Sequence, residues 1–206
     1  MVTLHPAVAY FNDENGSLIH QSTVSISDEL AHNSSTVYAI LQKLVAELKS
    51  IMPKVKYIHY FTDSPTSQHR NKTIFHTLTQ HDKEFGIPAS WHYFEAGHGK
   101  GPCNGVRGTT KRKADEAVKQ QKATIQDTDD FFLWMQAQKE NSSIKYLFVS
   151  KEQCSDAQTS IDRFGNLQSV EGTMKLHAVI PVNSMEGYVA IRNTSCFCVN
   201  HFSDGT

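Results

Sequence analysis

Hydrophobic and polar positions in the first part of the chain form two segments that one polar cluster separates. Residues 7–11 and 18–26 are rich in β-branched and aromatic side chains, and the polar residues 13–16 separate them. This pattern predicts a β-hairpin. Ser27 and Asp28 follow, and both are typical helix-capping residues. We therefore expect a short turn of helix from these two residues through Ala31.

The hydrophobic period then changes to that of a helix. From Ser35 onward apolar residues recur every three or four positions until Pro53, which predicts one amphipathic helix. Residues 55–62 are almost continuously apolar, which indicates a strand buried on both faces, as in a parallel sheet. Further helices are expected to run up to Gly86, from the glycine-rich stretch towards Lys122, over 127–138 and over 150–161. Further strands are expected over 90–96, 144–149, 176–182 and 188–191.

Strands that alternate with helices predict an α/β fold with a parallel portion in its sheet. In such sheets functional groups gather where the strands end. Asp63 directly follows the strand over 55–62, and a glycine-rich stretch follows the next strand. We therefore expect these two features to be neighbours. The chain has 206 residues, a length typical of one sizeable domain.

The glycine-rich stretch, residues 98–113, combines glycines with basic side chains at the start of a predicted helix. Backbone amides at a helix start attract anions, and glycines allow a second backbone to come close. A phosphate-bearing partner is the simplest interpretation, and a capped loop before a solvated helix is the alternative. The predicted nucleic-acid contacts are Lys100, Arg107, Lys111, Arg112 and Lys113.

The charge, the apolar runs and the cysteine count of the chain exclude several classes of protein. The formal net charge of −1 argues against a protein that coats DNA with its whole surface, so any nucleic-acid contact must be local. No apolar run approaches the roughly 20 residues that cross a bilayer, so we expect no membrane partner. Four cysteines in a chain of this length do not resemble a secreted disulfide framework. We expect an intracellular, nuclear location.

Several sequence motifs resemble a known group of proteins across nearly the whole chain. They are VTLHP at 2–6, ISD at 26–28, YFTD at 60–63, WHYF at 91–94 and the HGKGPCNG stretch at 98–105. The chain is similar in these motifs to animal transposon-derived proteins related to DDE-type transposases. This resemblance implies an RNase H-like mixed sheet flanked by helices, as a single domain over 1–206 with C-terminal additions over about 140–206.

The resemblance also implies a metal site and shows where this chain departs from it. Enzymes of the RNase H-like fold hold two divalent metals, Mg²⁺ or Mn²⁺, with carboxylates. Asp63 matches the second carboxylate, but Asn104 stands where the family pattern has Asp, and an amide lacks the charge that such a site prefers. His98 is a further candidate catalytic residue. Glu95 or Asp115 would be a substitute carboxylate outside the motif.

A second departure concerns the usual first, central strand of the fold, which is not visible ahead of the hairpin. Unpaired backbone groups in a buried sheet are costly, so either the chain lacks this strand and the sheet is rearranged, or another segment or another chain fills the position. We therefore expect self-association, for example as a dimer, or a protein partner.

Cysteine and histidine residues offer other candidate chemistry. Cys196, Cys198 and His201 would bind zinc if Cys154, Cys103 or a histidine completed the four ligands; buried or idle thiols are the alternative. His59 and His92 lie on predicted strands and are either ligands near Asp63 or ordinary packed side chains.

Taken together, these features predict a transposase-derived protein whose catalytic site is impaired and which acts as a nucleic-acid- or protein-binding module. The first alternative is a divalent-metal-dependent nuclease or transposase. The second is a domain that acts through protein contacts alone.

Overall fold

The computed structural model of the chain describes residues 2–63, 69–94, 101–138, 143–182, 184–195 and 197. They form two compact units, each built from two separate stretches of sequence. Unit 1 consists of residues 1–31 and 100–154, and unit 2 consists of residues 32–99 and 155–206. Each unit has its own sheet and hydrophobic core, so the fold is mixed α/β with two mixed sheets flanked by helices.

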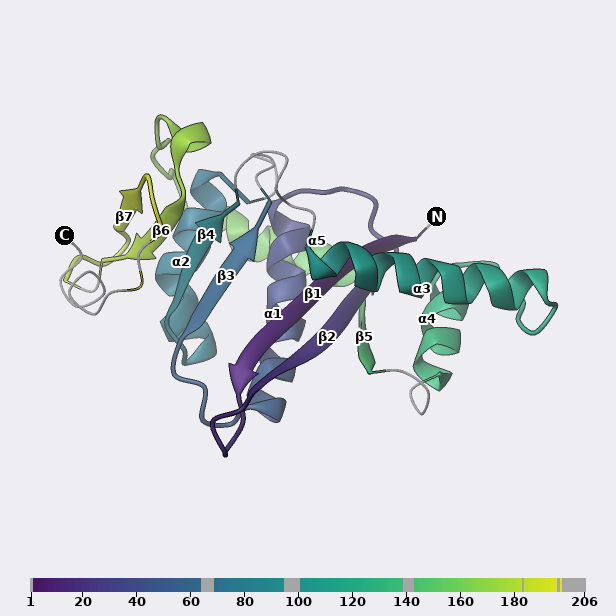
Figure 1. The fold of residues 1–206 in the computed structure, drawn as a ribbon. Helices are drawn as coiled ribbons and strands as arrows, with labels where there is room; N and C mark the ends of the chain where they lie inside the picture. The colour runs from purple at the N-terminus through teal and green to yellow at the C-terminus, as the bar shows by residue number, and fades with distance from the viewer. Residues whose placement is uncertain are drawn as a thin grey trace. The chain divides into compact units, whose positions relative to one another are not determined.

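Unit 1 is organised around the predicted hairpin. Strands β1 (Thr3–Asn12) and β2 (Leu18–Ser27) pair antiparallel along their whole length. Strand β5 (Ile144–Val149) then pairs parallel to β2, which gives the sheet order β1-β2-β5 (Figure 1). The segment that we expected to be a C-terminal addition therefore supplies a strand to this sheet, beside β2.

Two helices of unit 1 pack on this sheet. Helix α3 (Pro102–Lys119) contacts β1 and β2, and helix α4 (Thr128–Ala137) contacts β2 and β5. Asp127 caps α4 by accepting a hydrogen bond from the backbone amide of Asp130 at 2.9 Å. The core between sheet and helices consists of Leu4, Val24, Ile26, Ala114, Phe131, Met135, Ile144 and Tyr146.

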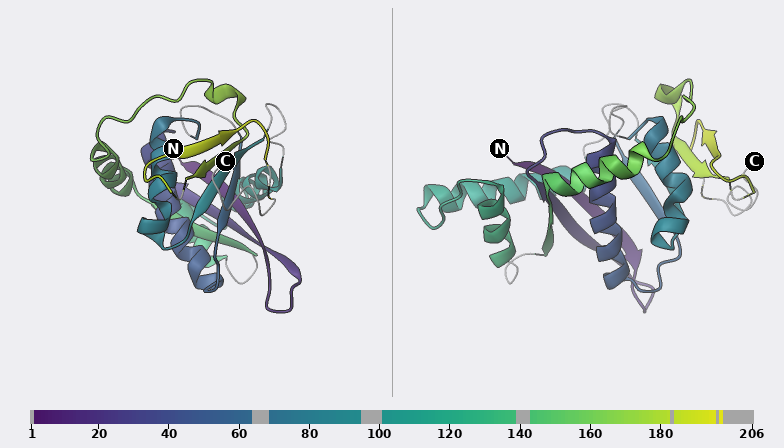
Figure 2. Two further views of the ribbon diagram at one scale, coloured as in Figure 1. Left: turned by 90° about the vertical axis from the view of Figure 1, so that its left-hand side faces the viewer. Right: turned by 180° about the vertical axis from the view of Figure 1, so that it is seen from behind.

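Unit 2 holds the second sheet, with strand order β3-β4-β6-β7. Strands β3 (Ile58–Thr62) and β4 (Ala89–Tyr93) are parallel, as the helix between them predicts. Strands β6 (Ala178–Pro181) and β7 (Val189–Arg192) continue the sheet antiparallel, and both come from the C-terminal part of the chain (Figure 2).

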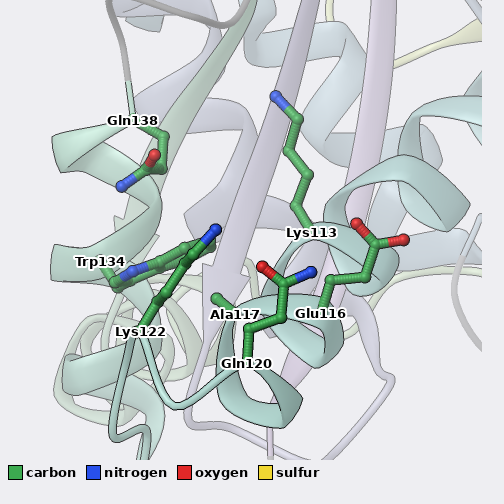
Figure 3. Close-up of a pocket in the computed structure, with 7 residues that line it drawn as sticks. All are labelled: Lys113, Glu116, Ala117, Gln120, Lys122, Trp134 and Gln138. Carbon is green, nitrogen blue, oxygen red and sulfur yellow. The ribbon is translucent and has the colours of Figure 1, made fainter.

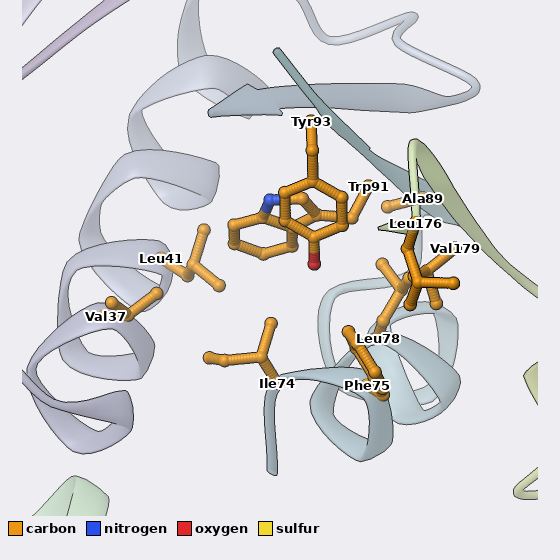
Figure 4. Close-up of a cluster of buried hydrophobic side chains, with 10 residues drawn as sticks. All are labelled: Val37, Leu41, Ile74, Phe75, Leu78, Ala89, Trp91, Tyr93, Leu176 and Val179. Atoms are coloured by element: carbon orange, nitrogen blue, oxygen red, sulfur yellow. The ribbon is translucent and has the colours of Figure 1, made fainter. Parts of the chain in front are cut away.

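Helices α1 (Ser34–Ile51) and α2 (Lys72–Phe85) pack against each other in unit 2. Asn33 and Asn71 cap their first turns, and Gly86 ends α2 with a positive φ of 69°, which glycine adopts without strain. Both helices direct apolar side chains towards β4, where the indole of Trp91 lies in the centre of the cluster (Figure 4). The buried members are Val37, Leu41, Ile74, Phe75, Leu78, Ala89, Trp91, Tyr93, Leu176 and Val179.

Helix α5 (Lys151–Asp162) contains the boundary between the units, and a single 3₁₀ turn, η2 (Thr173–Lys175), precedes β6.

Two local predictions are wrong. Residues 27–31 form no helix, because Ser27 Oγ accepts a hydrogen bond from the Glu29 amide and the Glu29 carboxylate accepts one from the Ala31 amide, which stabilises an extended bend. Strand β3 is also not buried on both faces. Its side chains alternate between half-buried and exposed, and it begins only at Ile58.

Candidate functional site

Helix α3 begins inside the glycine-rich stretch. Gly101 is its N-cap residue, in an extended conformation and without a side-chain cap, and Pro102 occupies the first helical position. The predicted turn is therefore helical from this point on, and Gly105 and Gly108 lie within α3. A Cβ atom at either glycine would meet nothing within 4 Å, so neither is required for close packing.

The side of α3 that faces away from the sheet carries positive charge. Arg107, Lys111 and Arg112 are exposed, whereas Thr110 and Ala114 face the core. Among the residues that the structure describes, the only ion pair joins Lys83 and Glu186 in unit 2, so these three side chains have no acidic partner there. Between Gly101 and Lys122 the sequence has six basic and two acidic side chains, in a chain with a net charge of −1: Arg107, Lys111, Arg112, Lys113, Lys119 and Lys122 against Asp115 and Glu116.

The residues of the predicted metal site belong to different units. Asp63 follows β3 in unit 2 and is exposed. Asn104 is exposed in the first turn of α3 in unit 1. His98 and Lys100, like Glu95, lie outside the described residues. The site that the resemblance implies therefore stays a prediction.

Beyond the predicted residues, unit 1 has a hollow that the sequence patterns did not indicate. It has a volume of 280 Å³ and lies between the C-terminal end of α3, the turn that follows and α4 (Figure 3). Seven residues line it: Lys113, Glu116, Ala117, Gln120, Lys122, Trp134 and Gln138.

Polar side chains in unit 2 form a continuous hydrogen-bonded chain across its sheet. His59 Nδ1 lies 2.8 Å from Ser90 Oγ, and Ser90 Oγ lies 2.8 Å from His92 Nε2. On its other side His92 Nδ1 lies 3.1 Å from Ser195 Oγ, which donates a hydrogen bond to the carbonyl oxygen of His177 at 3.3 Å. Ser90 and His92 are fully buried.

The carbonyl oxygen at the end of this chain fixes the direction of its hydrogen bonds. Because the Ser195 hydroxyl donates to the carbonyl of His177, Ser195 Oγ accepts from the Nδ1–H group of His92. Burial, and to a smaller extent the nearby His59 ring, lowers the pKa of His92 to about 4, so its ring is neutral at pH 7 and Nε2 accepts from Ser90.

This direction argues against Ser195 as a nucleophile, and Ser90, which does donate to His92, is fully buried. General-base activation requires the serine hydroxyl to donate to the imidazole, whereas here the imidazole donates to Ser195. The rings of Phe61 and Phe197 also contact the His92 ring, at centroid distances of 4.8 Å each. We interpret His92 as a packed core histidine with satisfied hydrogen bonds, which is one of the alternatives that the sequence left open.

Metal ligands do not gather in the described part of the chain, where no group of three or more histidine, cysteine, aspartate or glutamate side chains is placed to hold an ion. Cys196, Cys198 and His201 lie outside that part. Of the two cysteines proposed as a fourth zinc ligand, Cys154 is buried and Cys103 is half-buried.

The described helices also include none that is both long and apolar enough to cross a bilayer.

Comparison with known proteins identifies the family of the chain. The chain belongs to the family described as a domain of unknown function, DUF8701, whose family model matches residues 1–195. No curated protein and no solved structure matches it. The relation to DDE-type transposases thus remains an interpretation of the sequence motifs.

Proposed function

We propose that this DUF8701 chain is a nucleic-acid-binding protein that contacts phosphates through the exposed side of α3. The observation that carries the proposal is the row of exposed basic side chains, Arg107, Lys111 and Arg112, without acidic partners in the described structure. Arg107 and Lys111 are four residues apart and therefore lie on neighbouring turns of one helix face. Lysine and arginine without local ion pairs are available to neutralise phosphates.

The shape of this surface also supports the proposal. An 18-residue helix is about 27 Å long, so α3 extends over several consecutive phosphates of a nucleic-acid strand. The core packing of Thr110 and Ala114 holds the helix on the sheet, so its exposed face is positioned before a ligand arrives. The proposed role, in keeping with the resemblance to transposon-derived proteins, is that of a non-catalytic binding module in the nucleus.

The test is the salt dependence of binding to fluorescently labelled DNA, measured by anisotropy. We expect the logarithm of the binding constant to fall linearly with the logarithm of salt concentration, with a slope of roughly −0.7 to −0.9 per phosphate contacted. The double variant Lys111→Glu, Arg112→Glu should lose at least about tenfold in affinity and have a shallower slope, because two phosphate contacts become repulsive.

A matched control uses the same charge change in unit 2. Lys43 and Lys54 are both exposed there, and the double variant Lys43→Glu, Lys54→Glu should bind like the wild type. Equal losses of DNA affinity in the two double variants would show that the loss reflects the net charge of the protein and not the position of the charges on α3. Binding that is insensitive to salt and to the α3 variant would contradict the proposal and favour a role in protein contacts alone.

The same preparations test the nuclease alternative. Cleavage of the labelled DNA in the presence of Mn²⁺ that disappears in Asp63→Ala would reveal an active metal site and overturn the non-catalytic role. Cleavage that appears only in Asn104→Asp would identify the amide as the defect that inactivates the site.

A further inference from the structure

The hollow at the α3–α4 turn brings together three kinds of group. An aromatic ring is provided by Trp134, positive charge by Lys113 and Lys122, and amide groups by Gln120 and Gln138. In Figure 3 the Lys122 side chain crosses the indole, Gln120 extends from the C-cap position of α3, and the Lys113 side chain leaves α3 with its amino group directed away from the indole. One carboxylate, that of Glu116, also lines it.

Trp134 has two roles in this arrangement. It packs against the core cluster of unit 1, so its position on α4 is fixed, yet it remains only partly buried and lines the hollow. An aromatic ring that is anchored on one side and open on the other is a stacking platform, because a planar ligand gains contact area without ordering the side chain first.

The hollow is also continuous in sequence with the basic face of α3. Lys113 directly follows Lys111 and Arg112, and it lines the hollow instead of the outer face. A nucleic-acid strand whose phosphates contact the outer face of α3 therefore extends towards Trp134 at the end of the helix.

The chemistry of the lining identifies the occupant. Its volume of 280 Å³ is slightly below the roughly 300–1,000 Å³ of small-ligand pockets, which suits one planar group. The two lysines complement a phosphate, the indole complements the face of a base, and the glutamine amides both donate and accept hydrogen bonds at a base edge.

We propose that the hollow receives one unpaired nucleotide of the strand bound along α3, with its base stacked on Trp134 and its phosphate contacted by Lys113 and Lys122. This inference rests on the proposed nucleic-acid binding and adds a preference to it. A base inside a duplex is already stacked and paired, so it enters the hollow only after it leaves the helix, at a cost in free energy. The chain should therefore prefer single-stranded to double-stranded nucleic acid.

The experiment measures the affinities of wild type, Trp134→Phe and Trp134→Ala for a labelled single-stranded oligonucleotide and for the matching duplex. We expect Trp134→Ala to lose about 5- to 150-fold for the single strand, the range given by one stacked base, and less than about twofold for the duplex. Trp134→Phe, which retains a ring, should keep most of the affinity. Leu133→Ala is the matched control, because Leu133 is an exposed neighbour on α4 that does not line the hollow.

A change in the ligand separates a contact with the base from a change in folding. An oligonucleotide of the same length without bases should bind wild type and Trp134→Ala equally, because only the phosphates remain. Equal single-strand affinity in wild type and Trp134→Ala would overturn the inference, while loss of binding in the α3 double variant would still support the proposed function. Absence of binding by the wild type to either nucleic acid would overturn both.

Discussion

Unit 2 buries histidine side chains in hydrogen-bonded positions, whereas unit 1 displays basic side chains along α3. Nine of the 11 histidines belong to unit 2, and His81 and His92 are almost completely buried there. His81 donates from Nδ1 to the carbonyl of Ile87 at 2.6 Å, and its Nε2 accepts from the Tyr60 hydroxyl at 2.8 Å. In unit 1 the charged side chains of α3 are directed to solvent instead.

This difference between the two units indicates which of them offers polar groups to a ligand. Polar groups that satisfy one another inside a sheet stabilise that unit and offer little to a partner. Exposed charges without local partners contribute little to stability and remain available for binding. Three experiments test this contrast between a stabilising and a binding use of polar and aromatic side chains.

The two tryptophans provide the largest expected difference. Trp91 is 2% exposed in the core of unit 2 and donates a hydrogen bond to Thr62 Oγ1 at 2.9 Å, whereas Trp134 is only partly buried. We expect Trp91→Ala to lower the free energy of unfolding of unit 2 by about 3–5 kcal/mol. Trp134→Ala should cost unit 1 less than about 2 kcal/mol, because only part of the ring is packed.

Urea unfolding followed by circular dichroism measures both effects, and each variant retains one tryptophan whose fluorescence reports the other unit. A cost for Trp134→Ala as large as that for Trp91→Ala would show that Trp134 is mainly a core residue, which would weaken its assignment to binding.

The histidines provide an intermediate effect that depends on pH. The folded pKa of His92 is about 4, below the ordinary value of 6.5, so the unfolded state binds more protons between these values. Stability should therefore be complete above about pH 6.5 and fall as the pH decreases towards 4. For His92 alone the loss between pH 7.5 and pH 5 is about 2 kcal/mol.

Burial lowers the pKa of His69 to about 4 as well, so His69 should also reduce stability as the pH decreases. Urea unfolding of wild type and His92→Gln at the two pH values measures the contribution of His92, which the variant should lack. An identical pH dependence in the two proteins would show that His92 does not carry the effect.

The smallest effect concerns Asp115, one of the two exposed acidic residues of α3. Asp115 is exposed and follows Lys111 by four residues, so its carboxylate repels a phosphate bound there. We expect Asp115→Asn to raise the affinity for DNA about twofold at low salt, with no change at high salt. Anisotropy titrations at two salt concentrations would reveal it, and a loss of affinity would place the bound strand elsewhere.

The local structure was largely predictable from the sequence. Strand β5 has the predicted bounds, and α2 ends at the predicted Gly86, because a continuous apolar run between polar residues and a glycine after a periodic segment are both local signals. The outward-facing side of β3 was not predicted, since an apolar run does not reveal that His59 and Phe61 point away from the core.

Long-range relations were not predictable in the same way. Nothing in the sequence of β5 indicates that it pairs with β2, because an apolar strand is compatible with any neighbour. The hollow was missed for the same reason, as Trp134 and Lys113 come together only through the α3–α4 turn. The position of Arg107 on a helix was not predicted, because the glycines around it indicated a turn, whereas α3 already begins at Pro102.

The pairing of β2 with β5 has a consequence for how the chain acquires its structure during synthesis. The hairpin is made first, but its third strand and both of its covering helices follow only after all of α1, β3, α2 and β4. Contacts between such distant segments form slowly, and an unpaired strand edge is prone to aggregation in the meantime. A chain released before Ile144 would therefore expose one long edge of β2, so we expect such truncated products to depend on chaperones far more than a chain that includes β5.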